Sequence, residues 1–140
     1  MENNLKYFVP EISDICIGYE LEINWNRAYE EKWVPIKILV QDEEFAYTDE
    51  LSEIVNALHE GMSEARVPYL IKEQIEDEGW KLLNEDKYLQ FVKSDYSISY
   101  VEKLHLLIVT ALEEKQNDVK YSGTCKDINT FRKIIKLLEI

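Results

Sequence analysis

Glu20 and Glu22 are the residues of this sequence whose type and spacing come nearest to an enzyme's carboxylate pair. Residues two positions apart on a strand face the same side, so both carboxylates could hold one divalent ion or share acid and base roles. With Lys37 on a neighbouring strand, the arrangement would suit a metal-dependent hydrolase. The same alternation is typical of the solvated side of a strand, and no aspartate stands upstream at a strand end. The hydrolase therefore stays open as an alternative.

His59, His105, Cys16 and Cys125 are the side chains that could bind zinc or supply a nucleophile and its base. A zinc site needs three or four such ligands, and these four lie far apart in the sequence. Cys125 precedes the last predicted helix, so no helix N-terminus activates its thiol. Both cysteines are interpreted as free, small, buried apolar residues. We therefore predict no metal and no cofactor.

Short motifs of the common enzyme classes are absent from the sequence. It contains no GxGxxG, no GxxxxGK[ST] and no HExxH. It also lacks a GxSxG nucleophile elbow and a CxxC pair. The absence of these motifs favours a protein that binds rather than one that catalyses.

Aromatic residues give the clearest functional signal, with nine tyrosines and three tryptophans in 140 residues. Tyr and Trp supply rigid amphipathic contact area and are enriched at interfaces. The alternative is that they are half-buried strand residues, which suits their β-propensity. One group brackets the charged loop 25–33 and another lies in the hairpin 96–100. The predicted ligand- or partner-binding residues are Trp25, Arg27, Tyr29, Trp33, Tyr96, Tyr100 and Arg132.

The elements that position these residues begin with two alternating stretches in the N-terminal part. Apolar side chains fall on every odd position from 15 to 25, which predicts a strand with one buried face. Residues 34–40 alternate again and predict an antiparallel partner, which Pro35 places at a sheet edge or strand start. A helix is predicted from Thr48 to Gly61, and a shorter one between Pro68 and Gly79.

The C-terminal part returns to period-2 alternation with short turns. Strands are predicted at 80–83, 88–93, 96–101, 104–109 and 119–125, with 104–109 in the middle of the sheet because it is apolar on both sides. Short turns between the earlier of these strands exclude parallel crossovers. An amphipathic helix follows, beginning near Asp127. We predict one α+β domain over 1–140: an antiparallel β-meander with two or three helices, the C-terminal one packed on the sheet.

The net charge of −12 bears on the class of partner. Phosphate neutralisation supplies most of the affinity for a duplex, so direct nucleic-acid binding is not expected, and neither is an anionic membrane surface. Residues 115–140 carry +3 and the remainder −15. This basic tail could meet an anion or another copy of the chain, or it could complement the C-terminal end of the last helix. The N-terminus has no signal-peptide pattern, and we expect a cytoplasmic protein.

Residues 75–81 (Ile-Glu-Asp-Glu-Gly-Trp-Lys) predict a short helix that Gly79 and Trp80 break into a strand. Residues 121–128 (Tyr-Ser-Gly-Thr-Cys-Lys-Asp-Ile) lead from a strand into the last helix, whose apolar residues include Phe131, Ile134, Leu137, Leu138 and Ile140. Together, these stretches resemble small uncharacterised proteins encoded by bacterial phages and prophages. The resemblance covers the C-terminal half. It implies an α+β meander with a terminal helix in a bacterial host cytoplasm, and it brings no catalytic residues.

The sequence therefore predicts a non-catalytic binding protein, such as a phage accessory or counter-defence factor. It would act by protein–protein contact or by sequestering a small anionic ligand. The ligand version expects a homo-oligomer whose pockets combine Tyr or Trp with Arg27, Arg66 or Arg132. A virion or assembly component and the hydrolase built on Glu20 and Glu22 remain the alternatives.

Overall fold

The computed structural model describes residues 6–16, 18–25, 32–38, 50–61, 63–112 and 117–140. Contacts along the chain divide it into two compact units, which we call the N-terminal unit (residues 1–68) and the C-terminal unit (residues 69–140). Each unit has its own antiparallel sheet and its own core. The prediction of one domain over residues 1–140 concerns whether these two units unfold together, and it stays a prediction.

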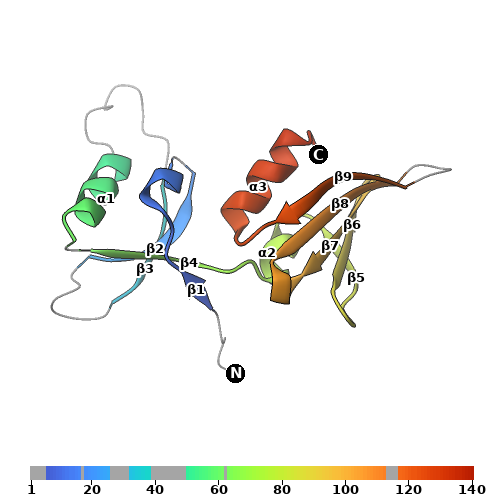
Figure 1. The fold of residues 1–140 in the computed structure, drawn as a ribbon, viewed down its shortest axis with the longest axis horizontal. Helices are drawn as coiled ribbons and strands as arrows, with labels where there is room; N and C mark the ends of the chain where they lie inside the picture. The colour runs from blue at the N-terminus through green and yellow to red at the C-terminus, as the bar shows by residue number, and fades with distance from the viewer. Residues whose placement is uncertain (1–5, 17, 26–31, 39–49, 62, 113–116) are drawn as a thin grey trace. The chain divides into compact units, whose positions relative to one another are not determined.

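The sheet of the N-terminal unit has the strand order β1-β4-β2-β3 (Figure 1). Every pairing is antiparallel. Helix α1 (Glu50–His59) contributes Ile54 to the core on one side of the sheet. The elements are β1 (Tyr7–Phe8), a 3-10 turn η1 (Ile12–Asp14), β2 (Glu20–Asn24), β3 (Val34–Lys37), α1 and β4 (Glu64–Pro68).

Strand β2 confirms part of the predicted alternation. Leu21 and Ile23 are buried in the core of the unit, as the odd positions should be. The strand is shorter than the predicted 15–25 because Gly18 adopts a φ of 88°, which extended backbone does not allow. Ile15 still reaches the core from the turn that follows η1.

Strand β3 was predicted from the sequence, and strand β4 was not. Pro35 lies on β3, which is an edge strand of the sheet, as a residue without a backbone N–H requires. Strand β4 was not expected, because Ala65 and Val67 are its only buried apolar residues. It occupies an interior position between β1 and β2, and Pro68 ends it instead of opening a helix.

The C-terminal unit is a five-stranded meander in the order β5-β6-β7-β8-β9. Strand β8 is interior, as predicted, but it starts two residues late. Residues 102–104 form the 3-10 turn η3, and His105 follows in the left-handed region at φ 50°. The elements are α2 (Lys72–Asp77), β5 (Lys81–Asn84), β6 (Leu89–Lys93), β7 (Tyr96–Val101), η3 (Glu102–Leu104), β8 (Leu106–Leu112), β9 (Asn117–Thr124) and α3 (Ile128–Leu137).

Helix α3 packs on this sheet as the predicted amphipathic terminal helix (Figure 1). Phe131 is 1% exposed and meets Trp80 edge to face, with ring centroids 6.4 Å apart. Ile75 of α2 belongs to the same core, so both helices bury apolar residues against the same side of the sheet. The fold class is therefore the predicted α+β class with a packed C-terminal helix, but the structure has two antiparallel sheets, and the predicted meander is the second of them.

Candidate functional site

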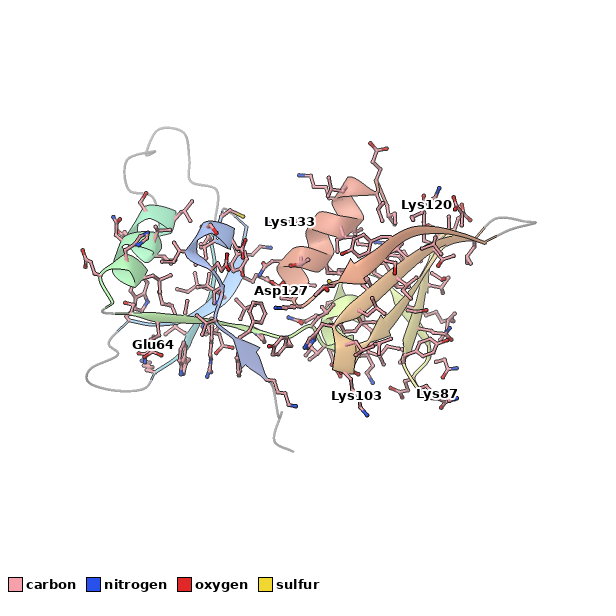
Figure 2. All side chains as sticks on the ribbon, in the orientation of Figure 1. Glu64, Lys87, Lys103, Lys120, Asp127 and Lys133 are labelled. Atoms are coloured by element: carbon pink, nitrogen blue, oxygen red, sulfur yellow. The ribbon has the colours of Figure 1, made fainter. Side chains whose placement is uncertain are left out.

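The outer face of the N-terminal sheet is the face that points away from α1. Strand register assigns it: Ile23 and Ala65 are paired and face the core, so the neighbouring pair Glu22 and Arg66 faces the other way. Pro35 lies opposite Glu22 on β3 and shares this face. Figure 2 shows Glu64 of β4 on the same side, away from α1. We call this surface the arginine face.

Arg66 is held at the centre of the arginine face by two aromatic rings. Its guanidinium carbon lies 3.8 Å from the ring centroid of Tyr7 and 4.1 Å from that of Trp33. Glu22 accepts hydrogen bonds from Nη2 at 2.8 Å and Nε at 3.1 Å. Cation–π contacts and a charge-assisted pair therefore fix the side chain in one orientation.

The Arg66–Glu22 pair is half-buried, with side chains 25% and 18% exposed. Loss of hydration raises the pKa of Tyr7. The Glu22 carboxylate raises it further, and the Arg66 charge offsets part of that increase. Tyr7 therefore stays a neutral phenol against the guanidinium at physiological pH. The centre of the arginine face combines a cation, a carboxylate and two rings with no net charge.

Arg66 keeps donor capacity for a partner. A guanidinium has five N–H groups, and the bonds to Glu22 use two of them. Within the described residues, the structure gives Arg66 no other acceptor. The remaining N–H groups could meet a backbone carbonyl or a carboxylate brought by another molecule.

A second unused polar atom lies beside this centre. Asn24 is 4% exposed, and its Oδ1 has no hydrogen-bond partner among the residues that the structure describes. It is two positions along β2 from Glu22, so it is on the same face, opposite Glu64. A buried acceptor without a donor costs about 1–3 kcal/mol.

The residues predicted around loop 25–33 separate in the structure. Trp33 takes part in the stack on Arg66. Trp25 follows β2, is 38% exposed, and its carbonyl accepts a hydrogen bond from Ser63 Oγ at 3.1 Å. Arg27 and Tyr29 lie outside the described residues. Of this group, Trp33 is therefore the residue that the structure brings to the arginine face.

The other three predicted binding residues belong to the C-terminal unit and serve its packing. Tyr100 is fully buried and donates a hydrogen bond to the Cys125 carbonyl at 2.8 Å, so it presents no surface to a partner. Tyr96 packs against the same core. Arg132 binds Glu78 through Nε at 2.6 Å and joins α3 to the end of α2.

The candidate catalytic residues have other contacts. The Glu22 carboxylate is paired with Arg66, which competes with any role beside Glu20 as a metal ligand. No three His, Cys, Asp or Glu residues of the described chain gather in a way that could hold a metal. His105 stacks on Tyr69 with ring centroids 4.4 Å apart.

Both cysteines are free, but they differ in exposure. Cys125 is buried as expected, and burial raises the pKa of its thiol from 9.0 to about 12. Cys16 is exposed, so the prediction that it is a buried apolar residue was wrong. The break that Gly18 makes before β2 explains this, because residue 16 is not on a strand.

Comparisons with known proteins give no family for this chain: no protein-family model, no curated protein and no solved structure matches it. No helix in the described part of the chain is long and apolar enough to cross a membrane.

Proposed function

We propose that this chain is a non-catalytic binding protein that acts by protein–protein contact through the arginine face. The observation that carries the proposal is the stack of Tyr7, Arg66 and Trp33 on a sheet face opposite the helix. Residues of these three types dominate the binding energy of protein interfaces. Here they form one group instead of being scattered over the surface.

Preorganisation is the physical reason that such a group would bind well. An arginine normally loses rotamer freedom when a partner immobilises it, at a cost of about 0.5–1.5 kcal/mol. Arg66 is already immobilised between two rings and by Glu22. A partner carbonyl or carboxylate would meet donors whose direction is set in advance.

Charge decides between a protein partner and a small anion. The Arg66–Glu22 pair is neutral as a unit, so it offers a free anion little net attraction. Residues 1–68 hold 15 acidic and 5 basic residues, a formal charge of −10. A neutral anchor on an acidic unit suits a protein with a basic rim, because the surrounding charge would speed the encounter.

The setting that we propose follows from the sequence resemblance: a phage accessory or counter-defence factor in the cytoplasm of a bacterial host. Acidic proteins can occupy the basic nucleic-acid-binding sites of other proteins, which is one way for such a factor to act. A virion component would use the same face inside a particle. Its stoichiometric presence in purified particles would distinguish that alternative.

The test compares partner capture by the full chain and by Trp33→Ala. Wild type, Trp33→Ala and the control Lys126→Ala are immobilised at equal density and exposed to host lysate, and bound proteins are quantified by mass spectrometry. We expect one or a few proteins to be enriched by wild type and control, and at least tenfold less by Trp33→Ala. Equal capture by all three folded variants would overturn the proposal.

A further inference from the structure

The outer face of the C-terminal sheet is the face away from α2 and α3. Strand register assigns its residues: Val109 and Leu107 are buried against the helices, so Ile108 and Thr110 face the other way. On the three central strands, the outward positions are Gln90, Val92, Ser97, Ser99, Val101, Leu106, Ile108, Thr110 and Leu112. We call this surface the uncharged face.

None of these nine positions carries a charge. Charged residues make up 31% of the chain, so nine positions of average composition would hold about three. The solvated face of an antiparallel sheet normally shows polar and charged side chains. The N-terminal sheet does so, with Glu20, Glu22, Lys37, Glu64 and Arg66 on its outer face.

Large apolar side chains lie on or beside the uncharged face, and Lys81 of β5, which pairs with the outward Val92, lies at its edge. Val119 of β9 pairs with Thr110 and is 57% exposed. Leu112 at the end of β8 is 41% exposed, and so is Tyr88, whose hydroxyl accepts a hydrogen bond from Gln90. Depletion of charge together with exposed apolar and aromatic residues is the composition of an interface core.

We propose that the uncharged face joins two copies of this chain by packing sheet against sheet around a twofold axis. Each copy carries −12, so two copies repel one another over most of their surface. A face without charge adds no repulsion of its own when it meets itself. The C-terminal unit also holds 13 acidic and 11 basic residues, −2 in all, so this is the half of the chain where two copies repel least.

The chemistry of the uncharged face suits self-pairing. Hydroxyls such as those of Ser97 and Thr110 both donate and accept hydrogen bonds, so the same group can face its own kind. β-Branched side chains such as Ile108 and Val92 can interdigitate across the roughly 10 Å that separates stacked sheets. A twofold contact requires this self-complementarity.

The size of the face sets the expected strength. The nine positions lie on three strands about 4.8 Å apart and about six residues long at about 3.3 Å each, so they make a surface of roughly 14 by 20 Å. This is below the area of about 800 Å² per partner that a standard interface buries. We therefore expect a reversible, concentration-dependent dimer. Salt should strengthen it, because screening weakens the repulsion between two acidic chains.

Sedimentation equilibrium of the full chain tests the proposal. It would cover low micromolar to millimolar concentrations at low and high salt. The variants are Ile108→Lys and Ser99→Lys, both at the centre of the uncharged face. Ser52→Lys, on the exposed surface of α1, adds the same charge elsewhere as a control. Far-ultraviolet circular dichroism confirms that each variant is folded.

We expect the mean mass of wild type and Ser52→Lys to rise towards twice the chain mass with concentration, and further with salt. Ile108→Lys and Ser99→Lys should weaken dimerisation at least tenfold. A wild type that stays monomeric throughout would overturn the proposal, whether or not it binds another protein. Dimerisation of folded Ser99→Lys at wild-type strength would overturn it too. Neither variant alters the arginine face, so this failure is distinct from failure of the proposed function.

Discussion

The two units of this chain share one architecture, but the outer faces of their sheets differ in chemical character. Each packs helix on one side of an antiparallel sheet, and no helix of the described residues packs on the other side. In the N-terminal unit that other side is charged and centres on an arginine between two rings, in a unit of formal charge −10. In the C-terminal unit the three central strands carry no charge on that side, in a unit of −2. Both cores are apolar because packing requires it. The two units therefore differ mainly in their outer faces, and our proposed functions use those faces.

The largest expected effect would show whether the two units are separate in stability. Phe131→Ala removes a ring that is 1% exposed in the core of the C-terminal unit and should destabilise that unit by about 3–5 kcal/mol. Thermal unfolding followed by tryptophan fluorescence would measure it. If the units are independent, the N-terminal transition should stay where it is. A single transition that moves as a whole would favour one cooperative domain over 1–140.

The next effect tests what holds the arginine face together. Arg66→Ala removes two cation–π contacts and leaves the half-buried Glu22 carboxylate without its partner, at a cost of about 2 kcal/mol. Chemical denaturation gives the value. Arg66→Lys keeps the charge but cannot stack as a plane or bind Glu22 through two nitrogens, so we expect it to recover only part of the loss. Full recovery would show that charge alone matters.

A buried thiol should make the stability of the C-terminal unit depend on pH. The buried Cys125 thiol has its pKa raised from 9.0 to about 12, so the folded state keeps a proton that the unfolded state releases. Its contribution is fully present below pH 9 and is lost as pH rises towards 12, by about 1 kcal/mol at pH 10. Burial raises the pKa of Tyr100 as well, so its loss follows at higher pH. Cys125→Ala should flatten the stability profile between pH 8 and 10. An unchanged slope in that variant would contradict this assignment.

The smallest effect is expected from a surface ion pair. Lys120 lies 2.8 Å from Asp118 on β9, and both side chains are largely exposed. Exposed pairs contribute little, so Lys120→Ala should change the free energy of unfolding by less than about 0.5 kcal/mol. The same denaturation experiment makes it a control for Arg66→Ala. A loss as large as that of Arg66→Ala would remove the distinction between the arginine face and ordinary surface charge.

Much of the fold could be predicted from the sequence, because period-2 alternation and glycine positions are local signals. The meander, the edge position of β3 and the packed terminal helix all follow from such signals. Strand β4 was not predicted because its five residues, with two buried apolar side chains, make too short an alternating pattern. The sequence suggested a contrast between acidic residues 1–114 and a basic tail from residue 115. The structure divides the chain at residue 68 instead, so β9 and α3 belong to the same unit as β5 to β8.

The arginine face was harder to predict because its residues are far apart in the sequence. Tyr7, Arg66 and Trp33 meet only after β1 pairs with β4, β4 with β2 and β2 with β3. The sequence identified Trp33 and named Arg66 among three arginines that could combine with Tyr or Trp, but it did not single out Arg66 and did not identify Tyr7. Composition also placed Tyr100 among the binding residues, although its alternation with Ile98 in β7 already put the two side chains on one face. Face assignment by alternation is therefore a better guide than aromatic clustering.

The central claim is that the two outer faces bind different things, and a crossed measurement tests it directly. Trp33→Ala and Ser99→Lys would each be assayed for partner capture and for dimerisation in the same buffer. We predict that Trp33→Ala loses the partner and keeps the dimer, while Ser99→Lys loses the dimer and keeps the partner. If each folded variant lost both activities, or neither lost either, the division of function between the faces would be contradicted.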